Sequence, residues 1–242
     1  MSVENERNFR MIKLYQFPTA FGVPNPSPFC VKVEVLLKMA GLDYESIVST
    51  NPGKGPKGKL PAIEDKGKMI GDSEFIRLHI ERQYGIDFDK GLDGRERAVA
   101  HAFARLFEER TYWALVYSRW IDESNWPKVH SAFFGSMPPV LRTVLPAMFR
   151  KKVRGYLNGH GIGRHSQDEI YALGVSDIRS AADWLGEKHY FMGEAPTGVD
   201  ATVYAFTENL ISPPHETPMK AEALRHANVV AYTRRMRERY FG

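Results

Sequence analysis

The chain has 242 residues, of which 43% are hydrophobic and 26% are charged, the composition of a globular protein with one large or two modest domains. Its formal charge of +4 is a small basic excess spread along the sequence, so we expect no nucleic-acid partner. No stretch approaches the roughly 18 to 20 apolar residues of a membrane span, and the polar first ten residues lack the apolar segment of a secretory signal. We therefore expect a cytoplasmic protein without a membrane partner.

The first third of the chain alternates strand and helix patterns. Ser27 is the expected N-cap of the first helix, with Pro28 at its first position and Gly41 at its end. The predicted order is βαβ followed by ββα, with strands at 11–17, 44–49, 59–65 and 68–72 and helices at 27–40 and 73–85. A helical crossover implies that the first two strands pair in parallel.

From about residue 92 onward the periodicity is almost entirely helical, which predicts an all-helical bundle. Ser166 with Glu169, and Thr197 with Asp200, have the spacing of helix-starting capping boxes. The predicted helices lie within 93–122, 139–159 (one or two helices), 166–188, 197–211 and 219–241.

The segment Ser27-Pro28-Phe29-Cys30 has the form of a redox Cys-Pro-Phe-Cys site with serine in place of the first cysteine. A helix N-terminus favours an anion, and the Ser27 hydroxyl can donate a hydrogen bond to a thiolate; simple helix capping is the alternative. Cys30 is the single cysteine, so it cannot run an intramolecular dithiol cycle. A buried structural thiol and a monothiol function both remain open for it.

Two other motifs are not interpreted as sites. The sequence GKGPKG at 53–58 imitates a phosphate-binding loop, but the Leu60-Pro61 step after it requires extended backbone instead of a helix. His160 and His165 lack a third ligand nearby, so no metal site is expected.

A thioredoxin-like domain over 11–88 followed by an all-helical domain over 93–242 resembles a cytosolic glutathione transferase. Within that superfamily the chain is most similar to the branch of failed axon connections and metaxin-like proteins. The residues that carry the resemblance are Ser27 to Cys30, Leu60 to Ile63, Asp72 to Ile76 and Thr197 to Asp200.

The resemblance implies a glutathione site on the first domain. Ser27 would stabilise the glutathione thiolate, and Leu60, turned outward by a cis Pro61, would pair with the cysteinyl backbone. Asp72 and Ser73 would hold the γ-glutamyl amino and carboxylate groups, which a helix N-terminus also favours. Lys59, or Lys57, would meet the glycine carboxylate, although lysines are common on any protein surface.

A small hydrophobic electrophile is expected between the two domains. Five aromatic residues are candidates for its pocket, although such a stripe also suits a helical core: Phe29, Tyr112, Trp113, Tyr117 and Trp120. Arg110 and Arg119 could attract an anionic substrate or pair with Glu108 and Glu109. The loop at 18–26 is long enough to cover or reshape the site.

The resemblance thus implies a homodimeric glutathione transferase that binds glutathione and an electrophile, and no metal is expected. Two alternatives remain open. One is a non-catalytic interaction protein with the same fold, and the other is a Cys30-dependent glutathione thiol transferase.

Overall fold

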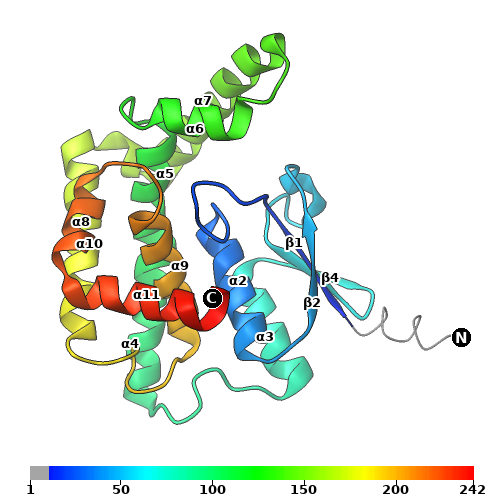
Figure 1. Ribbon diagram of the computed structural model, residues 1–242, viewed down its shortest axis with the longest axis vertical. Coiled ribbons are helices and arrows are strands. Elements are labelled where there is room, and N and C mark those ends of the chain that lie inside the picture. Colours follow the sequence, from blue (N-terminus) through cyan, green and yellow to red (C-terminus); the bar gives the residue numbers. More distant parts are fainter. Residues whose placement is uncertain (1–10) are drawn as a thin grey trace, which may run out of the picture.

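The computed structural model describes residues 11–242 and contains a four-stranded mixed sheet beside a group of helices (Figure 1). The sheet order is β2-β1-β3-β4. Strand β1 pairs in parallel with β2, whereas β3 is antiparallel to both β1 and β4. The strands are β1 (Ile12–Gln16), β2 (Tyr44–Val48), β3 (Ala62–Asp65) and β4 (Lys68–Gly71). The predicted thioredoxin-like βαβ-ββα order is confirmed.

The strand register brings three chain segments to one edge of the sheet. Tyr15 pairs with Ala62, and Ala62 pairs with Gly71. The end of β1, the Leu60-Pro61 step before β3 and the start of the helix after β4 therefore lie side by side. This edge carries the residues for which the family resemblance implies contacts with glutathione.

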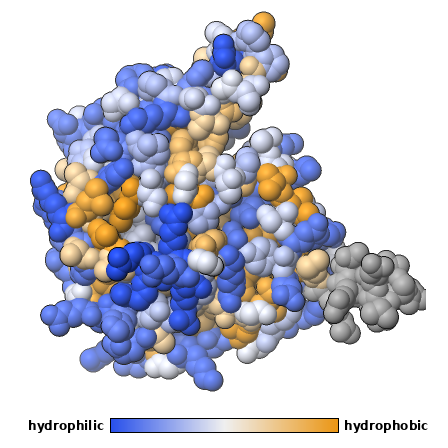
Figure 2. Space-filling model, in the orientation of Figure 1, coloured by the Kyte–Doolittle hydropathy of each residue, from blue (hydrophilic) through white to orange (hydrophobic). Residues whose placement is uncertain are grey.

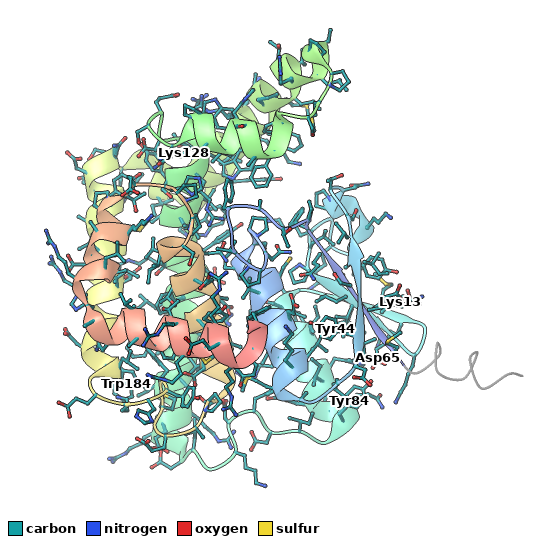
Figure 3. The ribbon with its side chains drawn as sticks, viewed as in Figure 1. Lys13, Tyr44, Asp65, Tyr84, Lys128 and Trp184 are labelled. Atoms are coloured by element: carbon teal, nitrogen blue, oxygen red, sulfur yellow. The ribbon has the colours of Figure 1, made fainter. Side chains whose placement is uncertain are left out.

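Helices α2 (Pro28–Met39) and α3 (Ser73–Tyr84) belong to the same domain as the sheet. Asp65 at the end of β3 ties the sheet to α3, because its carboxylate lies 3.0 Å from the Tyr84 hydroxyl and 2.7 Å from His79 Nε2 (Figure 3). Helix α2 lies between the sheet and the helical domain, so its first turn is close to both (Figure 1).

The helical domain confirms the all-helical prediction, but two of the predicted helices are divided. The predicted helix 219–241 is two helices, Pro218–Arg225 and Ala227–Phe241. The predicted long helix is α4 (Gly94–Arg105) and α5 (Tyr112–Trp120) joined by a π-helical turn, Leu106–Thr111. The region 139–159 forms a single helix, α7. The remaining helices are α6 (Trp126–Phe134), α7 (Pro139–His160), α8 (Gln167–Leu185), α9 (Gly198–Ile211), α10 (Pro218–Arg225) and α11 (Ala227–Phe241).

A buried ionic network connects the two domains at the π-helical turn. Lys32 of α2 is 1% exposed, and its ammonium donates to Glu108 at 2.8 Å and to Glu74 of α3 at 2.9 Å. Glu108 also accepts hydrogen bonds from Arg105 at 2.6 Å and from Thr202 of α9 at 3.0 Å. Two cations and two carboxylates balance, which is the condition under which buried charges are tolerated.

The predicted capping boxes at Ser166 and Thr197 are both present. The second is completely buried, because Asp200 is 0% exposed. Its carboxylate accepts hydrogen bonds from the Thr197 and Phe191 N–H groups at 2.7 and 2.8 Å and from the Tyr232 hydroxyl at 3.0 Å. Asp200 therefore joins α9, α11 and the segment before α9, whereas an ordinary capping residue bonds only within its own helix.

Candidate glutathione site

Ser27 occupies the N-cap position of α2, but its hydroxyl makes no capping hydrogen bond. The Ser27 carbonyl accepts from Cys30 and Val31, which starts the helix, whereas the Phe29 N–H has no partner within residues 11–242. Pro28 contributes no N–H. A half-buried hydroxyl and one unpaired N–H thus lie at the positive end of a helix, the arrangement that binds an anion.

The loop before Ser27 is held in place by a buried asparagine, which is 1% exposed. The Asn25 amide donates to the Phe17 carbonyl at 2.7 Å and to the Gln16 side chain at 3.2 Å. Its oxygen accepts from the Ser27 N–H at 3.0 Å. Asn25 therefore fixes Ser27 relative to the end of β1, so the loop at 18–26 forms part of the site's support.

Arg119 of α5 lies beneath this loop as a buried cation. Its guanidinium donates to the Pro26 carbonyl at 2.6 Å and to the Asn209 carbonyl and side-chain oxygens at 2.8 and 2.9 Å. Burial lowers the pKa of Arg119 to about 10, so the group stays charged at neutral pH. No carboxylate pairs with it within residues 11–242, contrary to the option of pairing with Glu108 or Glu109. Its positive charge adds to the anion preference at Ser27.

The Leu60-Pro61 peptide bond is cis, as predicted. Leu60 is 7% exposed, and neither its N–H nor its carbonyl is hydrogen-bonded within the described chain. Because the strand register places this step next to the end of β1, both groups are available for an extended peptide near Ser27.

Asp72 and Ser73 start α3 on the other side of the Leu60-Pro61 step. Asp72 has a φ of 82°, which is rare for a residue other than glycine, and its Oδ1 accepts from the Glu74 N–H at 3.0 Å. Ser73 is 4% exposed, and its hydroxyl makes no hydrogen bond within residues 11–242. Asp72 therefore caps the helix, while Ser73 keeps a free donor at its N-terminus.

Lys59 and Lys57 are exposed and lie against aromatic rings. The Lys59 ammonium is 5.5 Å from the centre of the Tyr156 ring of α7, and that of Lys57 is 4.1 Å from the Phe75 ring. Lys59 thus extends from the sheet edge toward the helical domain. Its charge is available to an anion that binds between the two.

The structure brings three of the five proposed pocket residues together. The Phe29 and Tyr112 rings are 4.9 Å apart, and Tyr112 and Trp113 are 5.2 Å apart. Burial raises the pKa of Tyr112, whose hydroxyl has no hydrogen-bond partner within the described residues. These rings connect Ser27 to the helical domain.

Tyr117 and Trp120 do not belong to this group. Tyr117 packs edge-on against Tyr171 of α8, with ring centres 6.0 Å apart. Trp120 stacks on Phe133 at 5.9 Å beneath α6. Both rings contribute to packing between helices, and their assignment to the pocket stays a prediction.

Cys30 is completely buried under the first turn of α2. Burial raises the pKa of its thiol to about 12, against the smaller opposing effects of the Ser27 hydroxyl and the Phe17 backbone. A thiol with this pKa is almost entirely protonated at neutral pH and is a poor nucleophile. The environment favours a structural role over a monothiol role.

We expect Cys30 to react with a thiol reagent such as dithionitrobenzoate at least about a hundredfold more slowly in the native protein than in urea, because the reactive thiolate is scarce and covered. Absorbance of the released thionitrobenzoate at pH 8 measures both rates. Comparable rates in the two states, with a native circular dichroism spectrum before urea is added, would show that Cys30 is accessible and would revive the thiol transferase alternative.

Two known families of domains match parts of the chain. A family described as the N-terminal domain of glutathione S-transferase matches residues 28–125, and one described as the glutathione S-transferase C-terminal domain matches residues 174–236. The chain belongs to the glutathione S-transferase family. The similarity to metaxins and failed axon connections inferred from the sequence is confirmed as well.

Three relatives illustrate the range of the family. Isoprene-epoxide–glutathione S-transferase of Rhodococcus sp. (strain AD45) is 30% identical, over 95% of this chain and 99% of its own length. Failed axon connections of Drosophila melanogaster is also 30% identical, over 96% of this chain but 58% of its own length. Metaxin-1 of Macaca fascicularis is 25% identical over 83% of this chain and 65% of its own.

Solved structures support the fold. Beta-etherase LigF from Sphingobium sp. strain SYK-6 superposes with a TM-score of 0.67 at 16% identity, over 94% of this chain and 95% of that one. A glutathione transferase family member from Pseudomonas fluorescens pf-5, with two glutathione bound, has a TM-score of 0.60 at 17% identity, over 95% and 89% of the two chains. At these identities the likeness concerns architecture.

Residues 11–242 contain neither a membrane-spanning helix nor a cluster of metal ligands. None of the helices in this part of the chain is long and apolar enough to cross a membrane. Nor do three or more His, Cys, Asp or Glu side chains come together there in a position to hold a metal ion.

Proposed function

We propose that this protein is a glutathione transferase in which the Ser27 hydroxyl stabilises the thiolate of bound glutathione. The observation that carries the proposal is that Ser27 stands at the N-cap of α2 without using its hydroxyl as a cap. That hydroxyl, the Phe29 N–H and the charge of Arg119 all favour an anion at one place. Together they lower the pKa of a thiol that has no base of its own.

The rest of glutathione fits along the same sheet edge. The free backbone groups of Leu60 pair with the cysteinyl residue as an added strand would. The free Ser73 hydroxyl at the start of α3 donates to the γ-glutamyl carboxylate, and the second carboxylate oxygen of Asp72 is left for the amino group. Lys59 supplies the cation for the glycine carboxylate.

The electrophile occupies the space beside Phe29, Tyr112 and Trp113, which suits a small hydrophobic compound. The Rhodococcus relative is named for an epoxide, a member of this class. On an epoxide, the thiolate sulfur forms a bond to one ring carbon and the carbon–oxygen bond breaks. The unbonded Tyr112 hydroxyl then donates its proton to the released oxygen, which becomes an alcohol.

Calorimetric titration of glutathione into the wild-type protein, Ser73→Ala and Ser180→Ala tests the binding half of the proposal. We expect wild type and Ser180→Ala to bind alike, because Ser180 is an exposed serine of α8, and Ser73→Ala to bind about tenfold or more weakly. No binding by the wild-type protein would overturn the proposal. In that case the non-catalytic interaction protein, which the metaxin relatives support, takes its place.

A further inference from the structure

Helix α7 stands away from the rest of the molecule. It has 22 residues, of which only Pro146 and Leu157 are buried, and its N-terminal half forms an arm together with α6 (Figure 1). The C-terminal half is attached to the body, because Arg150 donates to the Trp120 and Ile121 carbonyls at 2.9 and 3.1 Å. The outer half of α7 has no comparable contacts to the body within residues 11–242.

The free face of this outer half is apolar. Val140, Val144 and Met148 are 74%, 58% and 54% exposed, and their spacing of four residues places them in one row. Leu141, beside this row, is 46% exposed. On the face shown in Figure 2, the outer end of the arm has a few orange atoms among pale and blue ones. Monomeric proteins rarely leave such a contiguous row uncovered, which indicates an interaction surface.

The charge of the same region is strongly one-sided. Between residues 124 and 167 there are seven lysines and arginines and no aspartate or glutamate, although the whole chain contains 33 basic and 29 acidic residues. The remaining residues therefore carry 26 basic and 29 acidic groups. Lys151, Lys152 and Arg154 are exposed on α7, one to two turns after the apolar row.

We propose that the α6–α7 arm docks on an anionic lipid surface. The row Val140, Val144 and Met148 enters the boundary between headgroups and acyl chains, and Lys151 and Lys152, in line with it along the helix, meet the lipid phosphates. An apolar face followed by basic residues is the pattern of helices that lie in a membrane interface. A second copy of the chain fits less well, because α6 and α7 carry six lysines and arginines and no aspartate or glutamate, so two copies of this pair of helices would repel one another.

This surface was not expected from the sequence, where the basic excess is spread along the chain and no membrane partner was predicted. The segment without acidic residues forms an interaction surface because the fold projects it from the body.

Docking also has a consequence that rests on the proposed function. His160 of α7 stacks on Trp113 with ring centres 4.8 Å apart, so the helix that docks on lipid also contacts the aromatic pocket at its other end.

Flotation with vesicles of phosphatidylcholine, with and without phosphatidylserine, tests the proposal directly. We expect the wild-type protein to float with the anionic vesicles and to be released by high salt. The double variants Val144→Asp/Met148→Asp and Lys151→Glu/Lys152→Glu are each expected to bind about tenfold or more weakly. Leu224→Asp, on α10 and 50% exposed, is the matched control and should bind like wild type.

Circular dichroism and glutathione binding establish that the variants are folded. The proposal is overturned if wild type ignores anionic vesicles, if it binds neutral vesicles equally well, or if both double variants float like wild type. Light scattering, which gives the mass in solution, tests whether a second copy of the chain covers this face instead. A wild-type protein that binds no vesicles and is a dimer, and that becomes a monomer in Val144→Asp/Met148→Asp, would identify the face as an interface between copies.

Discussion

Replacing Ser27 by alanine is expected to lower kcat/KM for glutathione conjugation by about 10²- to 10³-fold. This is the usual effect of losing one preorganised hydrogen-bond donor that stabilises an anion. The fold should be unaffected, because the Ser27 hydroxyl makes no capping bond and the helix start depends on its carbonyl. The loss should be greatest near neutral pH, since the thiol of the variant's bound glutathione ionises only at a higher pH.

Thiolate absorbance of bound glutathione across pH measures this directly, together with the pH profile of kcat/KM. Ser27→Thr is the control, because it keeps a hydroxyl at the N-cap and should recover most of the activity. If Ser27→Ala binds glutathione and shows a wild-type thiol pKa, the serine does not stabilise the thiolate, and Arg119 and the helix N-terminus are sufficient.

Asp200→Ala is expected to lower the free energy of unfolding by about 3–5 kcal/mol, a large share of the stability of a typical domain. The substitution leaves the N–H groups of Phe191 and Thr197 and the Tyr232 hydroxyl without acceptors in a completely buried place. Each unpaired buried donor costs about 1–3 kcal/mol, although the structure relaxes in part.

Urea unfolding followed by circular dichroism gives the value. Asp93→Ala is the matched control: Asp93 also forms a capping box, at the start of α4, but in an exposed position. It should cost about 1 kcal/mol, as an ordinary cap does. Equal losses in the two variants would mean that burial adds nothing to the Asp200 box.

The sequence was sufficient to predict features that depend on local spacing. Capping residues at Ser166 and Thr197 begin helices where expected, whereas the cis form of Pro61 was implied by the family resemblance. The strand–helix order then followed, because short connections leave few ways to arrange the elements. Family resemblance supplied the position of the glutathione site, which local spacing alone does not give.

Residues that act across long sequence separations could not be predicted. Arg119 reaches Pro26 over 93 positions, and no pattern in the sequence pairs the two. The aromatic row of α5 is divided between two environments for another reason. Tyr112 and Trp120 lie about 12 Å apart along the helix axis, so side chains on one face of the helix have different neighbours at its two ends. The free surface of α7 depends on its projection, which follows from tertiary structure.

The buried ionic network at Lys32 determines how the two halves of the chain depend on each other. Its charges come from Lys32 and Glu74 on one side and from Arg105 and Glu108 on the other, and separating the halves would break the two ion pairs that cross between them, Lys32–Glu108 and Arg105–Glu74. The protein should therefore unfold in one cooperative transition. The sheet domain is not an independent module that can be excised or exchanged, and its partner must supply both apolar contacts and the charged groups that pair with Lys32 and Glu74.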